Sequence, residues 1–498
     1  MRRLPRLSAP VVWTAAIATL SVLYMALVVP LGSGPDEPEH TYRVFQLVGG
    51  NLLPSLVSCV GHLTRSACLG DTGRLAPPNR AGGQVPAVLV ATFDQLYHVF
   101  HHGLHPIHFK ASDYLKLLGS TLGGNGHRFA NFENTALYSP VNYLPETVVF
   151  WIARHTSESV IAALFTARLL TGIVWAALVT AAVAVTPRWK WLFSLVVLVP
   201  TALSQSAVIN ADAASLGVVA LTAAYALRLA DRGVPPRAHQ LALLALLGLV
   251  LGLMKLPLIL VLVAVLAILW PVLGAGRKRA SRAGMIALPG VAASVWWNIA
   301  SNAYFVPYRN IVYGTADRVA ISQHAQERYL LAHIDKLPVI LWSSAVHGHL
   351  FMLWEVVGTL GEVGLPEWFA IVWIVLFVVL AIGSEGPGIG RAARWWVAGV
   401  LAAYFLGTAL ALYLTWSQVG AAGISGMHGR YFTLVLVFAI PLIAGLGGGR
   451  IRHQPRAIAA AAVIISGLSA ATMFVYAAYH YYGQGPWQVV PKLTSVLF

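Results

Sequence analysis

Long apolar runs recur along the whole chain of 498 residues, and they constrain its fold more than any other feature. Hydrophobic residues make up 58% of the sequence, charged residues make up only 10%, and the mean hydropathy is +0.71. Soluble domains have a larger charged share and a smaller apolar share than this. Because runs of about twenty apolar residues form membrane-spanning helices, we predict a single all-α integral membrane domain covering residues 1–498.

Eleven of these runs are predicted to be transmembrane helices. They cover residues 11–32, 162–186, 191–208, 211–230, 239–254, 256–274, 283–303, 366–383, 394–415, 431–447 and 457–479. If the N-terminus lies inside, basic connections such as "GRKRASR" and "GRIRHQPR" all face the cytoplasm, whereas the short outer connections contain little more than Lys255 and Arg430. The positive-inside rule therefore predicts that the N-terminus lies inside and the C-terminus outside.

This orientation places two large segments outside the membrane, residues 33–161 and 304–365. The first segment holds the only two cysteines, Cys59 and Cys68. An oxidising exterior permits a disulfide between them, so we predict that bridge, with two unreactive thiols as the alternative. The net charge of +15 does not indicate a nucleic-acid partner, because the basic residues are scattered through short connections rather than gathered on one face.

The same segment contains "YHVFHHGLHPIHF", residues 97–109, which has five histidines. Tracts rich in histidine can bind metal ions. His98, His101 and His105 recur at helical spacing, however, and this favours one face of a helix on the membrane surface.

Five separated segments place polar residues at the outer ends of the predicted spans. The first is "GPDEPEH", where Asp36 and Glu37 follow the first span directly. An ionisable residue at such a position is costly to bury and is a candidate for function. The candidates for substrate binding are His40, Arg43, Tyr138, Asn142, Tyr143, Gln205, Asp212, Lys255, His428, Arg430 and Tyr431.

An outward-facing site of this composition suits the transfer of a sugar from a lipid-linked phosphate. A carboxylate such as Asp36 can take the proton of an acceptor hydroxyl that attacks the anomeric carbon. The leaving phosphate gains negative charge, and Arg430, Lys255 and Arg43 are cations that could stabilise it. No Walker A sequence is present, which argues against an ATP-driven transporter with its motor in this chain.

Several blocks of sequence resemble a family of bacterial predicted membrane proteins with a domain of unknown function. These blocks are "PDEPEHTYRVFQLVGGNLLP", "YSPVNYLP", "PTALSQSAVINADA", "GTLGEVGLP" and "GRYF". The family is grouped with the GT-C superfamily of integral-membrane glycosyltransferases. The resemblance therefore implies a GT-C-like architecture in the bacterial plasma membrane.

The same resemblance implies roles for individual residues. GT-C enzymes carry an acidic motif in the first outer loop, which corresponds here to Asp36 first and Glu37 second. These residues would serve as catalytic base or bind a divalent cation. The implied donor is a polyprenyl-phosphate-linked sugar, usually transferred with inversion, and the acceptor is a glycan or glycolipid of the cell envelope.

Two other functions and several structural roles remain as alternatives. The chain could be a transporter or flippase of lipid-linked glycans, or a non-catalytic component of an envelope-polymer assembly. Asp36 and Glu37 could be a solvated helix end, and Asp212 could form an ion pair with an arginine. Arg430 and Lys255 could anchor lipid headgroups, and Tyr138 and Tyr143 could belong to the interfacial aromatic belt.

Overall fold

The computed structural model describes most of the chain. The described residues are 8–58, 79–101, 109–123, 126–307, 321–346, 351–360, 363–386, 388–447 and 455–497. Cys59 and Cys68, the pair predicted to form a disulfide, lie outside these ranges. The side chains of His98, His101 and His105 also lie outside the described part. The two interpretations of the histidine-rich tract therefore stay predictions.

The protein is mostly helical, and six helices within the described ranges are long and apolar enough to cross a membrane. They are α1 (Ala9–Val28), α5 (Val160–Val185), α8 (Asp212–Asp231), α11 (Gly276–Asn302), α17 (Arg391–Trp416) and α20 (Pro455–Tyr482). At 1.5 Å per residue the 26 residues of α5 extend about 39 Å, more than the roughly 30 Å of a hydrocarbon core. The chain therefore has the character of a multi-pass membrane protein, while eleven spans and their orientation stay predictions.

Shorter apolar helices occupy three more of the predicted spans. They are α9 (Ala238–Met254), the stretch of η4 (Leu256–Leu258), α10 (Ile259–Leu269) and η5 (Trp270–Val272), and α16 (Glu367–Gly383). Pro257 and Pro271 lie in the two 3-10 turns that flank α10. Proline lacks an N–H and clashes with the preceding helical turn, which accounts for the change of helix type.

The two remaining predicted spans are interrupted. Residues 191–208 form α6 (Lys190–Val197) and α7 (Pro200–Gln205), because Pro200 disfavours a helical conformation at Val199. Residues 431–447 form α18 (Arg430–Thr433), η7 (Leu436–Phe438) and α19 (Ala439–Ile443). Neither stretch is one continuous helix, and both contribute residues to the candidate site.

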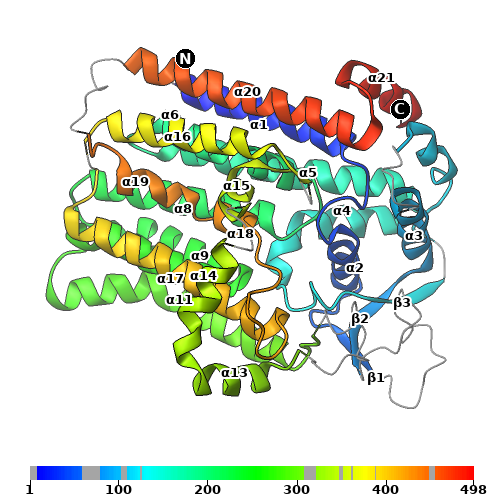
Figure 1. The fold of residues 1–498 in the computed structure, drawn as a ribbon, viewed down its shortest axis with the longest axis horizontal. Helices are drawn as coiled ribbons and strands as arrows, with labels where there is room; N and C mark the ends of the chain where they lie inside the picture. The colour runs from blue at the N-terminus through cyan, green and yellow to red at the C-terminus, as the bar shows by residue number, and fades with distance from the viewer. Residues whose placement is uncertain are drawn as a thin grey trace.

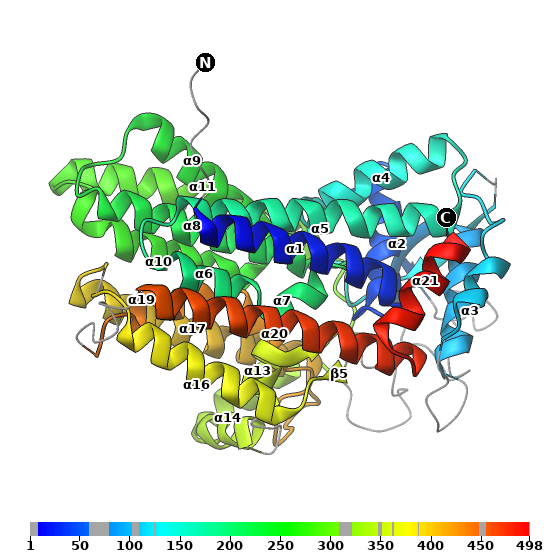
Figure 2. The same cartoon turned by 90° about the horizontal axis from the view of Figure 1, so that it is seen from above.

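The long helices run side by side (Figure 1). At one end of them lie α2 (Glu37–Val48), α3 (Ala87–His101) and the strands β1 (Ser55–Ser58), β2 (Asn79–Pro86) and β3 (His127–Asn131). Seen from above, α1 lies between α5 and α20 (Figure 2), and it contacts both. Of the six long apolar helices, α8 is the most enclosed: 72% of the residues in its most apolar stretch are buried, compared with 22% for α11. Apolar side chains on α11, such as Leu288 and Ile299, are instead exposed, as expected of residues that face lipid.

Residues 33–161 are not purely helical, so the prediction of an all-α chain is wrong there. Strands β1 (Ser55–Ser58), β2 (Asn79–Pro86) and β3 (His127–Asn131) form an antiparallel sheet in the order β1-β2-β3. Gly82 pairs with both Ser55 and Asn131, and a Cβ there would lie 2.1 Å from the carbonyl oxygen of Ala130. A second, two-stranded sheet pairs β4 (Thr359–Leu360) with β5 (Val363–Gly364).

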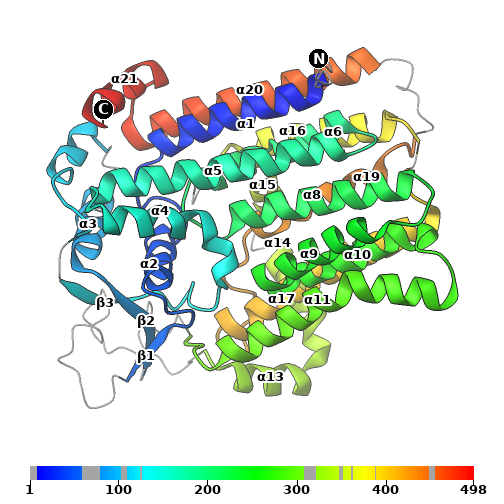
Figure 3. The ribbon, with the colours of Figure 1, turned by 180° about the vertical axis from the view of Figure 1, so that it is seen from behind.

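Shorter helices complete the described structure. They are α2 (Glu37–Val48), α3 (Ala87–His101), η2 (Ala111–Lys116), η3 (Pro140–Tyr143), α4 (Leu144–His155), α13 (Gln323–Ala332), η6 (Ile334–Lys336), α14 (Leu337–Val346), α15 (Phe351–Gly358) and α21 (Pro486–Leu497). From behind, α2, α3 and α4 lie beside the three-stranded sheet (Figure 3). This assembly covers the end of the bundle where α1 ends and α5 begins.

A fully buried ion pair holds this assembly to the bundle. Arg168 on α5 donates to both carboxylate oxygens of Glu37, with Nε to Oε1 at 2.7 Å and Nη2 to Oε2 at 2.5 Å. Arg168 also donates to the carbonyl oxygens of Val29 and Pro30, just after α1. Glu37 accepts from the backbone N–H of Ile209, which precedes α8. One pair therefore joins the end of α1, the start of α2, α5 and the approach to α8.

Loss of Arg168 is expected to destabilise the protein strongly. Arg168→Ala leaves the Glu37 carboxylate buried without its cation, which typically costs about 3–5 kcal/mol. The matched control is Arg188→Ala, whose partner Asp231 lies 2.8 Å away in a largely exposed pair, worth about 0–1 kcal/mol. Thermal unfolding of the purified protein in detergent measures both. Equal losses for the two variants would contradict the assignment, and Glu37→Gln combined with Arg168→Met should recover part of the stability.

Glu146 on α4 predicts a separate pH dependence of stability. Its side chain is fully buried, and burial raises the pKa of its carboxyl to about 7, compared with 4.5 for an unperturbed glutamate. Between these values the folded protein binds more protons than the unfolded chain. The stabilisation that this proton linkage gives to the folded protein is therefore complete below about pH 4.5 and is lost as the pH rises through about 7. The corresponding decrease in the free energy of unfolding is about 3 kcal/mol.

Glu146→Gln should remove this pH dependence, because the amide does not titrate. Unfolding temperatures of the variant and the wild type, measured from pH 5 to pH 8, should diverge as the pH rises, with the variant more stable at pH 8. Glu158→Gln, at an exposed glutamate just beyond α4, serves as the control and should follow the wild type. Parallel curves for Glu146→Gln and the wild type would show that the buried carboxyl does not titrate in this range.

Candidate functional site

Eight of the candidate residues predicted from the sequence line one small pocket. They are Asp36, His40, Tyr138, Gln205, Asp212, Lys255, Arg430 and Tyr431, together with Pro35, Asn210 and Ala211. They come from the start of α2, the turn before η3, the end of α7, the start of α8, the residue after α9 and the start of α18. Residues separated by almost 400 positions in the sequence thus meet where several helices begin or end.

Asp36 supplies the more accessible carboxylate of the pocket. It precedes α2 in a left-handed conformation, with φ 54°, which few residues other than glycine adopt but aspartate tolerates. Asn134 Nδ2 donates to its Oδ1 at 2.8 Å, and Arg430 Nη2 lies 4.0 Å from its Oδ2. The Asp36 side chain remains 40% exposed. The buried residue beside it, Glu37, fixes the backbone on which this carboxylate stands.

Asp212 and Lys255 form the tightest contact in the pocket. Asp212 is the first residue of α8, where the helix dipole favours a negative charge, and Asn210 Oδ1 accepts from its backbone N–H at 2.7 Å. Lys255 Nζ donates to Asp212 Oδ1. The same Nζ lies 5.3 Å from the ring centroid of Tyr138 and 5.6 Å from that of Tyr431. Asp212 therefore has a charged partner, which is a lysine and not the arginine considered as an alternative.

Arg430 is the second cation of the pocket. Its guanidinium carbon lies 5.5 Å from the ring centroid of Tyr431, and its side chain is only 12% exposed. Within the described part of the chain its Nε has no hydrogen-bond partner. Arg430 therefore retains a donor that a ligand oxygen or a water can use.

The remaining candidates support the pocket and do not line it. Glu37 points away toward Arg168, and its other hydrogen bonds come from the backbone N–H groups of Gly32, Gly34 and Ile209. A direct catalytic role for Glu37 therefore does not fit its position. Metal binding by Glu37 does not fit either, because both of its oxygens are already occupied. Among the described residues no three histidine, cysteine or carboxylate side chains converge as metal ligands.

Arg43 and Asn142 hold pocket residues in place through backbone contacts. Arg43 is buried and donates to the carbonyl oxygen of Tyr138 at 3.0 Å and to that of Leu52 at 2.6 Å. Asn142 Nδ2 donates to the carbonyl oxygen of Met254 at 3.2 Å, directly before Lys255. Neither side chain lines the pocket, so their expected roles in substrate binding become roles in positioning Tyr138 and Lys255.

His428 lies near the pocket without lining it. Its side chain is about half exposed, and its Nδ1 is 3.5 Å from Glu355 Oε2. The same Glu355 oxygen accepts from the backbone N–H of Gly429 at 2.5 Å. Glu355 thus holds the turn that leads into Arg430 and Tyr431.

His40 lines the pocket from α2 and is a neutral side chain at physiological pH. It is 6% exposed, and burial lowers the pKa of its imidazole to about 4. Its Nδ1 lies 2.6 Å from the hydroxyl oxygen of Tyr143, a fully buried residue outside the pocket. The Tyr138 ring stacks against His40 with the centroids 5.7 Å apart.

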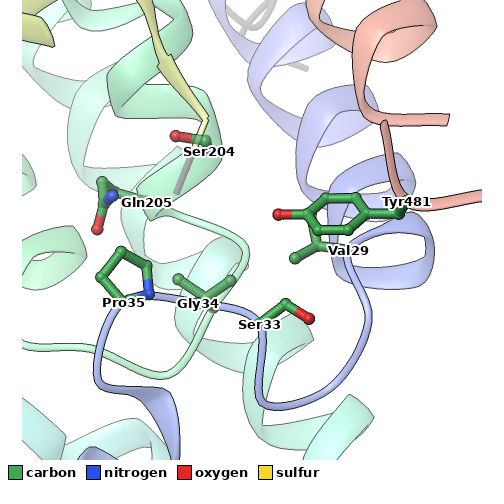
Figure 4. A pocket seen from close by; sticks show the side chains of 8 residues that line it. Val29, Ser33, Gly34, Pro35, Ser204, Gln205 and Tyr481 are labelled. Atoms are coloured by element: carbon green, nitrogen blue, oxygen red, sulfur yellow. The ribbon is translucent and has the colours of Figure 1, made fainter. Parts of the chain in front are cut away.

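A second, mainly apolar pocket adjoins the first (Figure 4). It is lined by Val29, Ser33, Gly34, Pro35, Ser204, Gln205, Val208 and Tyr481. Figure 4 shows the Tyr481 ring on one side and Gln205 with Pro35 on the other. Pro35 and Gln205 line both pockets, and Gln205 Nε2 has no hydrogen-bond partner among the described residues. Gln205 can therefore donate to a ligand or water at the boundary.

Sequence reasoning missed three residues on which this site depends. They are Asn134, which contacts Asp36, Arg168, which pairs with Glu37, and Glu355, which holds the turn before Arg430. Asn210, which binds the start of α8, stands out in the sequence as one of the polar residues of "QSAVINADAAS". Arg168 carried a usable signal, because a charged residue inside an apolar span needs a partner. Glu355 carried a similar signal, because it is the one charged residue of the apolar helix α15, "FMLWEVVG". Asn134 lies in a polar segment and carried no comparable signal.

Comparison with known proteins gives a match at the level of a family. A family model described as "Predicted membrane protein (DUF2142)" matches residues 20–439. This range contains every residue that lines either pocket except Tyr481. No curated protein and no solved structure matches the chain.

Proposed function

The chain belongs to the DUF2142 family of predicted membrane proteins, and we propose that this member is a glycosyltransferase of GT-C type. It would move a sugar from a polyprenyl-phosphate donor to a hydroxyl of a cell-envelope glycan or glycolipid. The observation that carries this proposal is the pocket itself, in which an accessible carboxylate faces two cations at the ends of apolar helices. A lipid-linked phosphate is the kind of substrate that combines a membrane-bound chain with a negative charge.

Asp36 is the base in this proposal. The acceptor hydroxyl attacks the anomeric carbon, its oxygen forms the new glycosidic bond, and its proton passes to the Asp36 carboxylate. Asp36 suits this role better than Asp212, because its contact with Arg430 is long and its side chain is accessible. Asp212 is instead engaged directly by Lys255. Asn134 keeps one Asp36 oxygen oriented while the other is open to the acceptor.

Lys255 and Arg430 stabilise the leaving group in this proposal. Cleavage of the bond between the anomeric carbon and the phosphate oxygen leaves the electron pair on the phosphate, which becomes more negative. Cations that are already in place stabilise that charge without reorganisation. Lys255 and Arg430 are both largely shielded from water, and charge interactions are stronger where water is excluded.

We place the protein in the bacterial plasma membrane with eleven spans and the pocket at the outer face. The basic connections support this orientation, since the pocket lies at the ends of spans opposite to those connections. A donor carried on a polyprenyl chain is then reached from the outer leaflet, and no nucleotide site is needed.

A transporter of lipid-linked glycans is the second candidate, and one structural observation favours it. Discontinuous helices often form the substrate site of transporters, and α7 and α18 border the pocket here as pieces of two interrupted stretches. Transport does not require a base that takes the proton of an attacking hydroxyl, however. The two functions therefore differ in what the loss of the Asp36 charge should do. A non-catalytic role in an envelope assembly likewise requires no base.

Asp36→Asn should abolish transfer while leaving the fold intact. Removing a general base typically costs about 10²–10⁴ in rate. The readout is mass spectrometry of lipids and glycans in membranes of cells that lack the protein, complemented with wild type or variant at equal protein levels. The matched control is Asp94→Asn, an exposed aspartate of the first outer segment that lies 3.7 Å from Arg128 and outside the pocket.

The outcomes separate the candidate functions. Loss of a defined sugar with Asp36→Asn, and its return with wild type and Asp94→Asn, would support transfer. Full restoration of the glycan by Asp36→Asn would eliminate Asp36 as the base and with it this mechanism. If a labelled lipid-linked glycan crosses vesicles containing the purified protein without being consumed, the transporter is the correct function.

A further inference from the structure

The contact between His40 and Tyr143 determines where the imidazole proton lies. Tyr143 ends η3 and is fully buried, with its hydroxyl 2.6 Å from His40 Nδ1. Within the described part of the chain the Tyr143 hydroxyl has no other hydrogen-bond partner. Its pKa is raised well above the ordinary value by burial, so the hydroxyl keeps its proton.

Two arrangements of this hydrogen bond are possible in principle. If Tyr143 donates to Nδ1, the single proton of the neutral imidazole is on Nε2. If Nδ1–H donates to the tyrosine oxygen, the hydroxyl proton of Tyr143 is left buried and unpaired. A buried donor without an acceptor is strongly unfavourable. The first arrangement satisfies both groups and is therefore the stable one.

Because Nδ1 contacts Tyr143, which does not line the pocket, Nε2 is the ring nitrogen of His40 that remains for the pocket. His40 lines the pocket, and within the described structure its Nε2 has no hydrogen-bond partner. The Tyr138 ring stacks on the imidazole with an interplanar angle of 21°, which restrains its orientation. The charged groups near His40 are Asp36, Asp212, Lys255 and Arg430, two of each sign. Their effects on the imidazole oppose one another.

We propose that Tyr143 fixes His40 in the Nε2–H tautomer, so that His40 donates a hydrogen bond to a phosphoryl oxygen of a lipid-linked phosphate in the pocket. The tautomer follows from the contact with Tyr143 alone. The identity of the oxygen rests on the proposed function. In this role His40 binds substrate and cannot be the base, because its available nitrogen already carries a proton. An uncharged donor also adds to Lys255 and Arg430 without adding repulsion between cations.

The tautomer can be read directly by nitrogen-15 solid-state NMR. The sample is the full-length protein in lipid bilayers at pH 7, labelled at histidine, with His40→Gln used to identify the His40 signals. We expect an unprotonated Nδ1 and a protonated Nε2. Tyr143→Phe should give a mixture of both tautomers, because the constraint on Nδ1 is gone. A protonated Nδ1 in the wild type, or an imidazolium ion, would overturn the proposal whatever the protein's activity.

The ligand is tested with a short polyprenyl phosphate, farnesyl phosphate, added to the same bilayers. Donation to its phosphate should move the Nε2 signal of His40 and leave the signals of His155, which is exposed on α4, unchanged. An unmoved Nε2 signal under conditions where the phosphorus signal shows binding would refute the assignment to phosphate. This measurement does not depend on sugar transfer, so it stands or fails separately from the proposed reaction.

Paired substitutions give a third readout. Glutamine places its amide near the position of Nε2, whereas asparagine places it near Nδ1. His40→Gln should therefore retain farnesyl phosphate binding within about tenfold of wild type, the scale of one hydrogen bond, while His40→Asn and His40→Ala lose more. His155→Gln is the matched control and should bind as wild type. Equal losses for His40→Gln and His40→Asn would contradict a donor at Nε2.

Discussion

The rest of the candidate site depends on the buried ion pair between Glu37 and Arg168. The pair lies at the junction of α1, α2, α5 and the approach to α8, and its partners are chiefly backbone groups. Such a pair stabilises weakly relative to apolar packing, yet it is very costly to break from one side. The pair therefore favours one relative arrangement of α1, α2, α5 and the approach to α8 over others. Asp36 precedes Glu37 directly, so the position of the accessible carboxylate follows from that of the buried one.

A division between supporting and lining residues runs through the whole site. The supporting residues are buried, and their side chains bind backbone groups or another side chain. Each is adjacent to, or in contact with, a residue that lines the pocket. They are Glu37, Arg43, Asn142 and Tyr143. Asp36, Gln205 and Arg430, which line the pocket, keep some exposure or an unused donor. Side chains whose hydrogen bonds are all made within the protein can hold geometry, but they cannot also bind substrate. Substrate binding and chemistry therefore require residues that still have a hydrogen-bond donor or acceptor without a partner in the protein.

The sequence predicted much of the pocket but little of its geometry. Polar residues at the ends of apolar runs were predicted to fall on one membrane face, so Asp36, Asp212, Lys255 and Arg430 could be assigned to one site from spacing and charge alone. Adjacent carboxylates could not be told apart, because the left-handed backbone at Asp36 turns Glu37 the other way. The sheet escaped detection because β2, "NRAGGQVP", lacks the alternation typical of strands. Apolar composition also concealed the break at Pro200, since both halves of that stretch are hydrophobic.

The interrupted helices explain how charged groups can meet at the edge of an apolar bundle. A helix that ends leaves backbone groups without partners, and α7, α8 and α18 begin or end at the pocket, where these groups are satisfied by Asn210 and Glu355. Asp212 is the first residue of α8 and Arg430 is the first residue of α18, so these helix ends place both charges in the partly enclosed pocket. Arg430 lies 4.0 Å from Asp36, a contact loose enough to be given up to an anion. In the proposed transfer reaction, a phosphate bound by Arg430 would therefore free the Asp36 carboxylate for an acceptor hydroxyl, and donor binding would prepare the proposed base.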